Sequence, residues 1–403
     1  MLLHTVLNTS LDKLVRPEIR LLRGSWPSFQ VCGYTGLALA ILLSITLVIY
    51  QHLSPLVMLG IILAAVLTFF AQAIITKIIL GEEDLVYYRH EIAVMAVATL
   101  LLWVLRQPIL PYLDATLLGI GIFLACGRIG CLMVGCCHGR PHSWGVCYRQ
   151  EHADAGFESC YVGVRLFPSQ AIESFWVFFV VLVGSLLVLS NHQPGTALTW
   201  YVVAYDVGRF SFEFMRGDTD RPYLWGFSEA QWVSIVLMCI LVTLEFFGIL
   251  PFQLWHLAAT LGVVITMLVV ALSRRLRKIP VHQLLYPYHI KEIAEVLQKV
   301  TGAVPVDIRV QHTSLGIQLS YSQIESEKGC LYHYALSCQR GTMTGEMAGA
   351  LANLILRLQY PPGSRELIRG NSGVFHVLVN PSGGAGKSIN SALRSVESLS
   401  SVK

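Results

Sequence analysis

The sequence predicts an all-α polytopic membrane protein with about seven transmembrane helices, an eighth candidate helix, and a small C-terminal soluble α/β segment. Three observations lead to this fold class. Of the 403 residues, 54% are hydrophobic and only 13% are charged, which is roughly half the charged fraction of a soluble domain. Apolar runs of membrane-spanning length follow one another from residue 29 to residue 272. From about residue 282 the composition becomes that of a soluble protein.

The first element, residues 1–28, is expected to be an amphipathic segment on the membrane surface. It contains Lys13, Arg16, Arg20 and Arg23, and basic amphipathic segments bind anionic lipid headgroups. It shows no apolar stretch typical of a signal peptide, so we expect membrane insertion to begin with the first transmembrane helix.

Residues 29–273 are predicted to form the transmembrane domain. Backbone groups in lipid must be hydrogen-bonded within the segment, so the apolar runs are expected to be helices. The candidates are residues 29–50, 54–80, 90–106, 112–134, 168–190, 196–215, 230–249 and 254–272. The eighth candidate follows the seventh through a tight connector and ends at the basic run 274–278. Counting Lys and Arg residues places both chain ends on the cytoplasmic side.

A soluble α/β domain is predicted for residues 282–380, followed by a flexible, Ser- and Gly-rich tail at 381–403. The predicted elements are a helix at 289–300, a hairpin at 305–312 and 314–320, a strand at 329–337, a helix at 342–358 and a strand at 373–379.

A polar motif from Gly127 to Arg140 lies at the end of the fourth apolar run. Its glycines allow close backbone approach or tight turns. Arg128 follows the apolar run directly, and an arginine can hold a lipid phosphate through paired, charge-assisted hydrogen bonds. The alternative is an arginine that merely extends its charged end to the membrane interface.

A second polar group lies in and directly after the sixth apolar run and consists of Asp206, Arg209, Glu213 and Arg216. Offsets of three, seven and ten residues place all four on one helix face. Ionisable residues inside membrane segments are expensive and mark functional sites by default. We interpret this face as an anion site whose arginine is oriented by a carboxylate, with a structural ion pair as the alternative.

Two helix starts carry supporting polar residues. Ser169, Gln170 and Glu173 begin the fifth run, and Ser228 and Gln231 begin the seventh. Either set taken alone is also typical of helix capping. His90 begins the third run and is the best-placed general base, because imidazole titrates near neutral pH.

Five of the ten cysteines lie between Cys126 and Cys147. Cys131, Cys136, Cys137, His138 and Cys147 are conceivable zinc ligands, but their spacing differs from a paired C-x-x-C pattern. The other interpretations are a disulfide from this loop to Cys147 or Cys160, and simple packing. We expect no metal and no cofactor. The net charge of +4, without a basic stripe, also argues against a nucleic-acid partner.

Taken together, the motifs resemble the prolipoprotein diacylglyceryl transferase family over about residues 55–250. Gly127, Arg128, Gly130, Gly135, Gly139 and Arg140 match its Gly-Arg motif. The later family motifs match Pro168, Ser169, Gln170 and Glu173, then Arg209, Phe210, Glu213 and Arg216, then Ser228 and Gln231. The chain departs from the family at Cys131 and Val134, where the family has Asn, and at Cys136, where it has an acidic residue. His90 is followed by Glu91 and Ile92 instead of two glycines.

The resemblance implies a multi-pass enzyme of the bacterial inner membrane, with about seven helices around a lipid-facing cavity. It implies transfer of the diacylglyceryl group of phosphatidylglycerol to a cysteine thiol of a prolipoprotein. The implied catalytic residues are His90, Arg128, Arg209 and Glu213. The implied substrate-binding residues are Gly127, Gly130, Cys131, Gly139, Arg140, Gln170, Glu173, Arg216, Ser228 and Gln231. The resemblance also implies an N-terminus that faces the outside of the cell, whereas the Lys and Arg count places it on the cytoplasmic side.

Two other classes of protein fit the same residues. One is a non-catalytic membrane protein that binds anionic lipid, and the other is a redox or metal protein that uses the cysteines. A transfer assay with phosphatidylglycerol and a lipoprotein-derived peptide separates the enzyme from the lipid-binding protein. Stoichiometric zinc or a mapped disulfide at Cys136 or Cys137 would favour the redox or metal protein.

Overall fold

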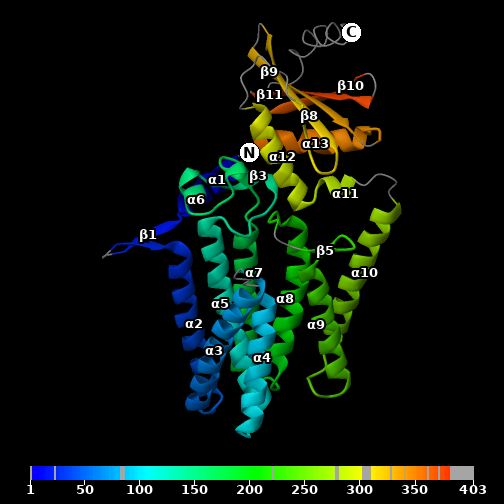
Figure 1. Ribbon diagram of the computed structural model, residues 1–403. Coiled ribbons are helices and arrows are strands. Elements are labelled where there is room, and N and C mark those ends of the chain that lie inside the picture. The colour runs from blue at the N-terminus through cyan, green and yellow to red at the C-terminus, as the bar shows by residue number, and fades with distance from the viewer. Residues whose placement is uncertain are drawn as a thin grey trace.

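The computed structural model shows a bundle of long helices with a smaller, strand-containing part at one end (Figure 1). It describes residues 2–21, 24–81, 87–219, 222–276, 281–301, 310–326, 329–339, 341–360, 363–370 and 373–381. The predicted mostly helical fold with a small C-terminal part is confirmed. The tail after residue 381 lies outside the described residues.

All eight predicted apolar segments are helices. Their bounds are α2 Ser28–Tyr50, α3 Pro55–Leu80, α4 Tyr87–Val104, α5 Ile109–Val134, α7 Ser169–Leu189, α8 Thr196–Phe212, α9 Glu229–Phe246 and α10 Leu254–Leu276. Six of them, α2, α3, α5, α7, α9 and α10, are long and apolar enough to cross a membrane. Helix α4 carries charged residues in its first turns, and α8 has only 17 residues and carries Asp206 and Arg209. The structure therefore supports six candidate spans, fewer than predicted.

Helix α5 occupies the centre of the bundle and packs against α2, α7 and α8. Hydroxyl groups on its neighbours donate hydrogen bonds to its backbone: Ser44 Oγ to Ala115 O at 3.1 Å, and Ser174 Oγ to Ala125 O at 2.8 Å. Helix α5 ends at Gly135, whose φ of 90° is the left-handed conformation that closes many helices. The Gly127–Arg140 motif therefore runs from the last turns of the central helix into the loop that follows.

That loop is an ordered structure, which we call the head, residues 135–168. It contains β3 Pro141–Cys147, α6 Gln150–Asp154, the 3-10 turn Ser159–Tyr161 and β4 Arg165–Leu166, with β3 and β4 paired antiparallel.

The N-terminal segment differs from the single amphipathic element that we expected. It forms helix α1 Leu2–Leu14 and a hairpin of β1 Glu18–Leu21 and β2 Gly24–Pro27. Helix α1 lies against the head, because Asp12 accepts a hydrogen bond from Cys147 N at 2.9 Å and pairs with Arg165 at 2.9 Å. Its position is therefore set by contacts with protein as well as by any contact with lipid.

The C-terminal part contains a five-stranded antiparallel sheet in the order β10-β11-β9-β8-β7. The elements are α11 Val281–Leu284, α12 Pro287–Thr301, β7 Gln311–His312, β8 Ile317–Ser326, β9 Gly329–Cys338, α13 Gly345–Gln359, β10 Ser364–Arg369 and β11 Phe375–Asn380. Residues 305–309 of the predicted hairpin lie outside the described residues, but β7 pairs with β8 as expected. Strand β10 was not predicted, because a short and polar edge strand has little hydrophobic pattern.

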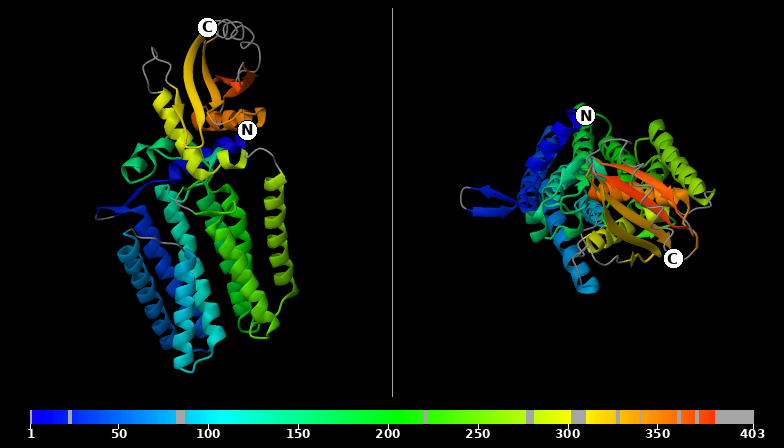
Figure 2. Two further views of the ribbon diagram at one scale, coloured as in Figure 1. Left: turned by 45° about the vertical axis from the view of Figure 1, so that its right-hand side comes forward. Right: turned by 90° about the horizontal axis from the view of Figure 1, so that it is seen from above.

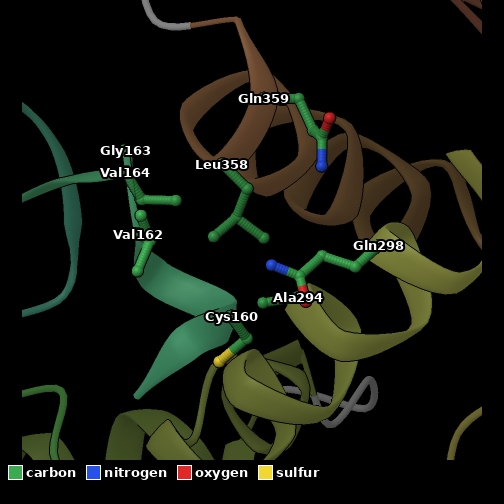
Figure 3. A pocket seen from close by; sticks show the side chains of 8 residues that line it. All are labelled: Cys160, Val162, Gly163, Val164, Ala294, Gln298, Leu358 and Gln359. Carbon is green, nitrogen blue, oxygen red and sulfur yellow. The ribbon is translucent and has the colours of Figure 1, made fainter. Parts of the chain in front are cut away.

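The C-terminal part packs on the head, and both belong to one apolar cluster (Figure 2). Lys291 Nζ of α12 pairs with Glu158 Oε1 of the head at 2.9 Å. A cavity of about 240 Å³ remains between them; Figure 3 shows Cys160 and Val164 of the head facing Ala294, Gln298 and Leu358. The N-terminal helix, the head and the C-terminal part therefore share one end of the helical bundle.

Candidate active site

Three arginines from two parts of the chain converge on one carboxylate at the head end of the bundle. Glu173, in the first turns of α7, forms an ion pair with Arg128 of α5, with 3.1 Å between Glu173 Oε1 and Arg128 Nε. Its Oε2 lies 3.5 Å from Nη1 of Arg209 and 3.5 Å from Nη1 of Arg216. The sequence had suggested Glu173 only as a supporting residue, whereas the structure makes it the centre of the site.

Two further carboxylates complete this arginine cluster. Glu213 Oε1 lies 2.5 Å from Arg209 Nη2 and 3.8 Å from Arg216 Nε. Asp218, which the sequence did not single out, holds Arg216 through two hydrogen bonds of 2.8 and 3.0 Å. The predicted orientation of Arg209 by a carboxylate is present in this geometry.

The arginine cluster is almost completely buried. Glu173 is 1% exposed, Arg216 1%, Arg209 3% and Arg128 7%. Buried charges are tolerated only when they are paired and hydrogen-bonded, so this concentration of ionic groups is a costly feature for a membrane helix bundle. Such a cost is typical of a functional site.

Asp206 does not join the arginine cluster, which corrects the prediction of a single four-residue face. It accepts a hydrogen bond of 2.8 Å from the Tyr88 hydroxyl of α4, and Tyr88 is also 2.6 Å from Ser234 Oγ of α9. Arg216 also leaves the expected helix face, because α8 ends at Phe212 and continues as a 3-10 turn, after which Arg216 is extended. Arg216 reaches the cluster through this change of backbone direction.

The end of the motif is clamped between two other segments. Gly139 N donates to Phe167 O at 3.0 Å, and Arg140 N donates to Met215 O at 3.0 Å. A Cβ added at Gly139 would collide with the backbone carbonyl of Phe167, so only glycine fits this crossing. Arg140 Nε donates to the carbonyl of Arg216 at 3.0 Å, which ties the motif to the arginine cluster.

Three of the four motif glycines, Gly127, Gly130 and Gly139, differ in their surroundings. A Cβ at Gly130 would press on Phe29 and Cys32 of α2, as close packing requires. A Cβ at Gly127 would meet nothing within 4 Å. The expectation of close backbone approach therefore holds for Gly130 and Gly139 but is wrong for Gly127, which borders open space one residue before Arg128.

Helix α7 also fixes the loop that follows α5. Gln170 Nε2 donates to Cys136 O at 2.8 Å, and Ser169 Oγ donates to Cys137 O at 3.2 Å. Gln170, Glu173 and Arg128 are thereby brought into one region, as the motif order suggested.

Ser228 and Gln231 form a capping box at the start of α9. Ser228 N donates to Gln231 Oε1 at 3.1 Å, and Gln231 N donates to Ser228 Oγ at 3.3 Å. Gln231 Nε2 also donates to Phe210 O of α8 at 3.2 Å. These bonds give both residues a structural role in joining α8 to α9.

His90 lies in the first turn of α4 and is buried. Its ring packs against Phe69 of α3, with 4.5 Å between ring centroids. Its assignment as general base stays a prediction.

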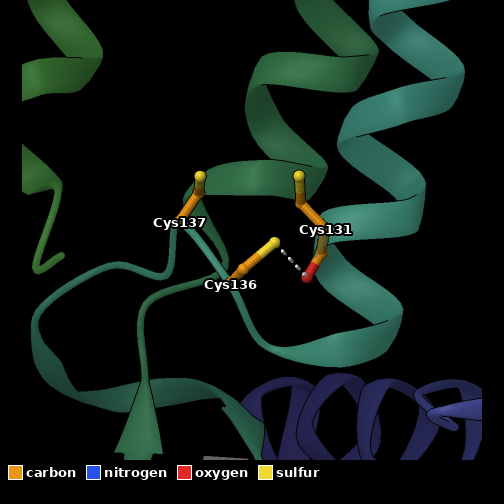
Figure 4. Close-up of side chains that lie close together, drawn as sticks. All are labelled: Cys131, Cys136 and Cys137. Carbon is orange, nitrogen blue, oxygen red and sulfur yellow. Dashed lines mark hydrogen bonds between the residues drawn. The ribbon is translucent and has the colours of Figure 1, made fainter. Parts of the chain in front are cut away.

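Three of the motif cysteines come together, as Figure 4 shows. The sulfur atoms of Cys131, Cys136 and Cys137 lie within 4.8 Å of one another. His138 instead faces its neighbour's carbonyl, with Nδ1 2.8 Å from Gly139 O, and Cys147 belongs to β3. Cys136, Cys137, Cys147 and Cys160 are free thiols, so the disulfide that the sequence left open is not formed.

The fold and the site define a class: a multi-pass membrane protein with a buried arginine cluster suited to an anionic group. A sequence model of the prolipoprotein diacylglyceryl transferase family matches residues 34–247, more than half of the chain. The chain belongs to this family.

Three relatives illustrate the match. Phosphatidylglycerol–prolipoprotein diacylglyceryl transferase 2 of Clostridium perfringens is 30% identical over 132 residues, which are 32% of this chain and 49% of the relative. The enzyme of that name from Dehalococcoides mccartyi is 32% identical over 135 residues, 33% of this chain and 49% of the relative. The enzyme of that name from Streptococcus agalactiae is 36% identical over 84 residues, which are 19% of this chain and 30% of the relative. The matches to the first two span about half the length of those relatives.

Proposed function

We propose that this protein transfers the diacylglyceryl group of phosphatidylglycerol to a cysteine thiol of a prolipoprotein. The observation that supports the proposal most directly is the convergence of Arg128, Arg209 and Arg216 on Glu173 in a buried site. Family membership and the names of the relatives supply the reaction.

The arginine cluster has both the charge and the free donor capacity that a phosphate needs. Arg140, which donates to the Arg216 carbonyl, brings the number of arginines to four, against the three carboxylates of Glu173, Glu213 and Asp218, an excess of one positive charge. Arg128 Nε and Arg216 Nη1 are buried donors that make no aligned hydrogen bond within the described part of the chain. An anionic oxygen that aligns with them gains charge-assisted hydrogen bonds inside a site of low dielectric.

In the proposed reaction the acceptor sulfur forms a bond to the glyceryl carbon while the carbon–oxygen bond to the phosphate breaks. Glycerol phosphate leaves with the electron pair, and the thiol gives up its proton. Arg128 and Arg209 stabilise the charge that grows on the leaving phosphate, and Glu213 holds Arg209 in place. His90 is the proposed acceptor of the thiol proton.

We propose further substrate contacts, which the geometry of the motif supports. Gly127 leaves open space beside Arg128 for the lipid, while Gly130 and Gly139 set the backbone positions of the motif. Cys131, Arg140, Gln170 and Arg216 border the same region, and Ser228 and Gln231 fix the start of α9. Membrane lipid and the prolipoprotein are the proposed partners.

Replacing Arg128 or Arg209 by Ala is expected to reduce transfer by about 10²–10³-fold, the cost of removing one transition-state donor. The measurement uses purified protein in phosphatidylglycerol vesicles with a lipobox peptide, and follows the peptide mass and released glycerol phosphate. Arg275→Ala, an exposed arginine at the same end of the bundle, is the control and should keep wild-type activity. Wild-type protein that binds phosphatidylglycerol without any turnover would favour the non-catalytic lipid-binding alternative.

We also propose that α4 and α8 cross the membrane with the six candidate spans. Helix α8 and its 3-10 turn cover residues 196–215, roughly 30 Å of helix. Helices α4 and α8 both pack against the central helix α5. Residues 29–273 are then the transferase domain, in the bacterial inner membrane, with residues 282–380 as a soluble domain at the site end.

The site end is proposed to face the outside of the cell. The Lys and Arg count favoured the opposite, but Arg128, Arg209 and Arg216 are buried in the arginine cluster and are poor reporters of topology. Reporter fusions after residue 381 are expected to be extracytoplasmic, and reporters inserted at residues 105–108 or 190–195 cytoplasmic. A cytoplasmic reporter after residue 381 contradicts this orientation.

A further inference from the structure

The cluster of Cys131, Cys136 and Cys137 is the feature that most clearly separates this site from the family pattern. The spacing of these residues argues against a metal site, because it lacks a C-x-x-C pair. The folded chain nevertheless brings their three sulfur atoms within 4.8 Å of one another. In a tetrahedral zinc–thiolate site, with bonds of ~2.3 Å, neighbouring sulfur atoms are roughly 3.8 Å apart. The three thiols therefore need only small side-chain movements to share one ion.

The backbone around the cluster is built to produce this convergence. Gly135 N donates to Cys131 O at 2.9 Å, and the left-handed conformation of Gly135 turns the chain back over the last turn of α5. Cys137 also has a positive φ of 55°, which is unfavourable for a residue with a side chain. Ser169 and Gln170 of α7 bind the carbonyls of Cys137 and Cys136 and hold this turn.

The surroundings of the sulfur cluster leave one side of it accessible. No carboxylate belongs to the cluster itself. Cys131 is buried, Cys137 is half-buried and Cys136 is exposed, so the cluster can be reached from one side. Three protein ligands and one accessible position are the arrangement of catalytic zinc sites, whereas structural sites use four protein ligands.

A disulfide explains the cluster less well. Adjacent Cys136 and Cys137 rarely bridge each other without strain, and pairing either with Cys131 leaves one thiol over. All three are free thiols in the structure.

We propose that Cys131, Cys136 and Cys137 bind a thiophilic divalent ion of the zinc class as three thiolates, and that the acceptor cysteine of the lipoprotein occupies the open fourth position. The second half of this proposal rests on the proposed function. A thiol that coordinates such an ion loses its proton more readily, so the ion would assist the proposed base His90 in forming the thiolate.

The chemistry is balanced and involves no change of oxidation state. The S–H bond of the acceptor breaks when it binds, and the proton passes to the proposed base His90 and from there to solvent. The sulfur then bonds to the glyceryl carbon, the carbon–oxygen bond to phosphate breaks, and glycerol phosphate leaves with the electron pair. The product is a thioether, a weaker ligand than a thiolate, so the lipidated peptide is released.

Metal content tests the first half of the proposal without any activity measurement. Full-length protein, reduced and incubated with ZnCl₂, is expected to retain about one zinc ion per chain after desalting. CoCl₂ in place of zinc should give the absorption bands of a cobalt–thiolate site. Replacing any one of the three cysteines by Ser should abolish these bands, whereas Cys126→Ser, a buried cysteine of the same helix, should keep them. Wild-type protein that takes up neither ion overturns the proposal.

The second half is tested with the acceptor itself. Adding a lipobox peptide to cobalt-loaded protein should shift the cobalt–thiolate bands, and the same peptide with Ser in place of Cys should leave them unchanged. An unchanged spectrum with the Cys peptide overturns the acceptor role. Wild-type transfer rates in a metal-free Cys137→Ser variant would also overturn the acceptor role. They would leave the proposed function intact. A peptide-induced shift without any lipid transfer would support the site and count against the proposed function.

Discussion

Replacing Glu173 by Gln is expected to abolish diacylglyceryl transfer and to lower the free energy of unfolding by about 3–5 kcal/mol. Three buried arginines lie within 3.5 Å of this carboxylate, so the neutral amide leaves them with mutual repulsion and only two remaining carboxylates. Thermal or denaturant unfolding in detergent, together with the vesicle assay, measures both effects.

Glu229→Gln is the matched control for this prediction. Glu229 pairs with Arg89 at 3.3 Å, but both side chains are about two-fifths exposed, at 39% and 43%. An exposed pair contributes about 0–1 kcal/mol, so this variant should remain close to wild type. A Glu173→Gln protein as stable and active as Glu229→Gln would show that the arginine cluster does not need its central carboxylate.

Replacing Gly139 by Ala is expected to cost about 1–3 kcal/mol of stability and to reduce transfer about 100-fold. The new Cβ would lie 2.7 Å from Phe167 Cβ and would also collide with the Phe167 carbonyl. The neighbouring segments cannot move apart freely, because Gly139 N is hydrogen-bonded to Phe167 O and Arg140 N to Met215 O. A shift of this backbone would also displace Arg216, whose carbonyl accepts a hydrogen bond from Arg140 Nε.

Gly127→Ala tests the same substitution in the same motif where the structure leaves room. Nothing lies within 4 Å of a Cβ at this position, so stability should be unchanged or slightly higher, since Ala favours a helix more than Gly does. Equal destabilisation by the two substitutions would contradict the close crossing at Gly139. Reduced transfer by a stable Gly127→Ala protein would support lipid binding beside Arg128.

The helices were predictable because their signal is local. Each apolar run carries its own length and composition, and helix hydrogen bonds form within the run. The same reasoning overestimated how many runs qualify as membrane spans. Helices α4 and α8 do not qualify, because they carry polar and charged residues where a typical span has apolar ones. The polar edge strand β10 was missed because its place depends on pairing with β11, a contact that is distant from the strand's own pattern.

Most residues of the arginine cluster were predictable from the sequence, except Asp218, but the geometry of the cluster was not. Arg128, Arg209, Glu213 and Arg216 were all identified from motifs, and Glu173 was noted beside them. The central position of Glu173 was not, because it depends on how α5, α7 and α8 are packed together. Asp206 shared a helix face with Arg209 by spacing, yet its partner is Tyr88 on α4.

The amino-acid sequence by itself determined that this chain is a helical membrane protein and which residues of four motifs bear its polar chemistry, because hydropathy, helix length and residue type are local properties. Tertiary structure alone decided that Glu173 joins three arginines and that three irregularly spaced cysteines share one small volume. The reason is physical: distances between side chains on different helices depend on packing and chain reversals, here the turn at Gly135 and the crossing at Gly139.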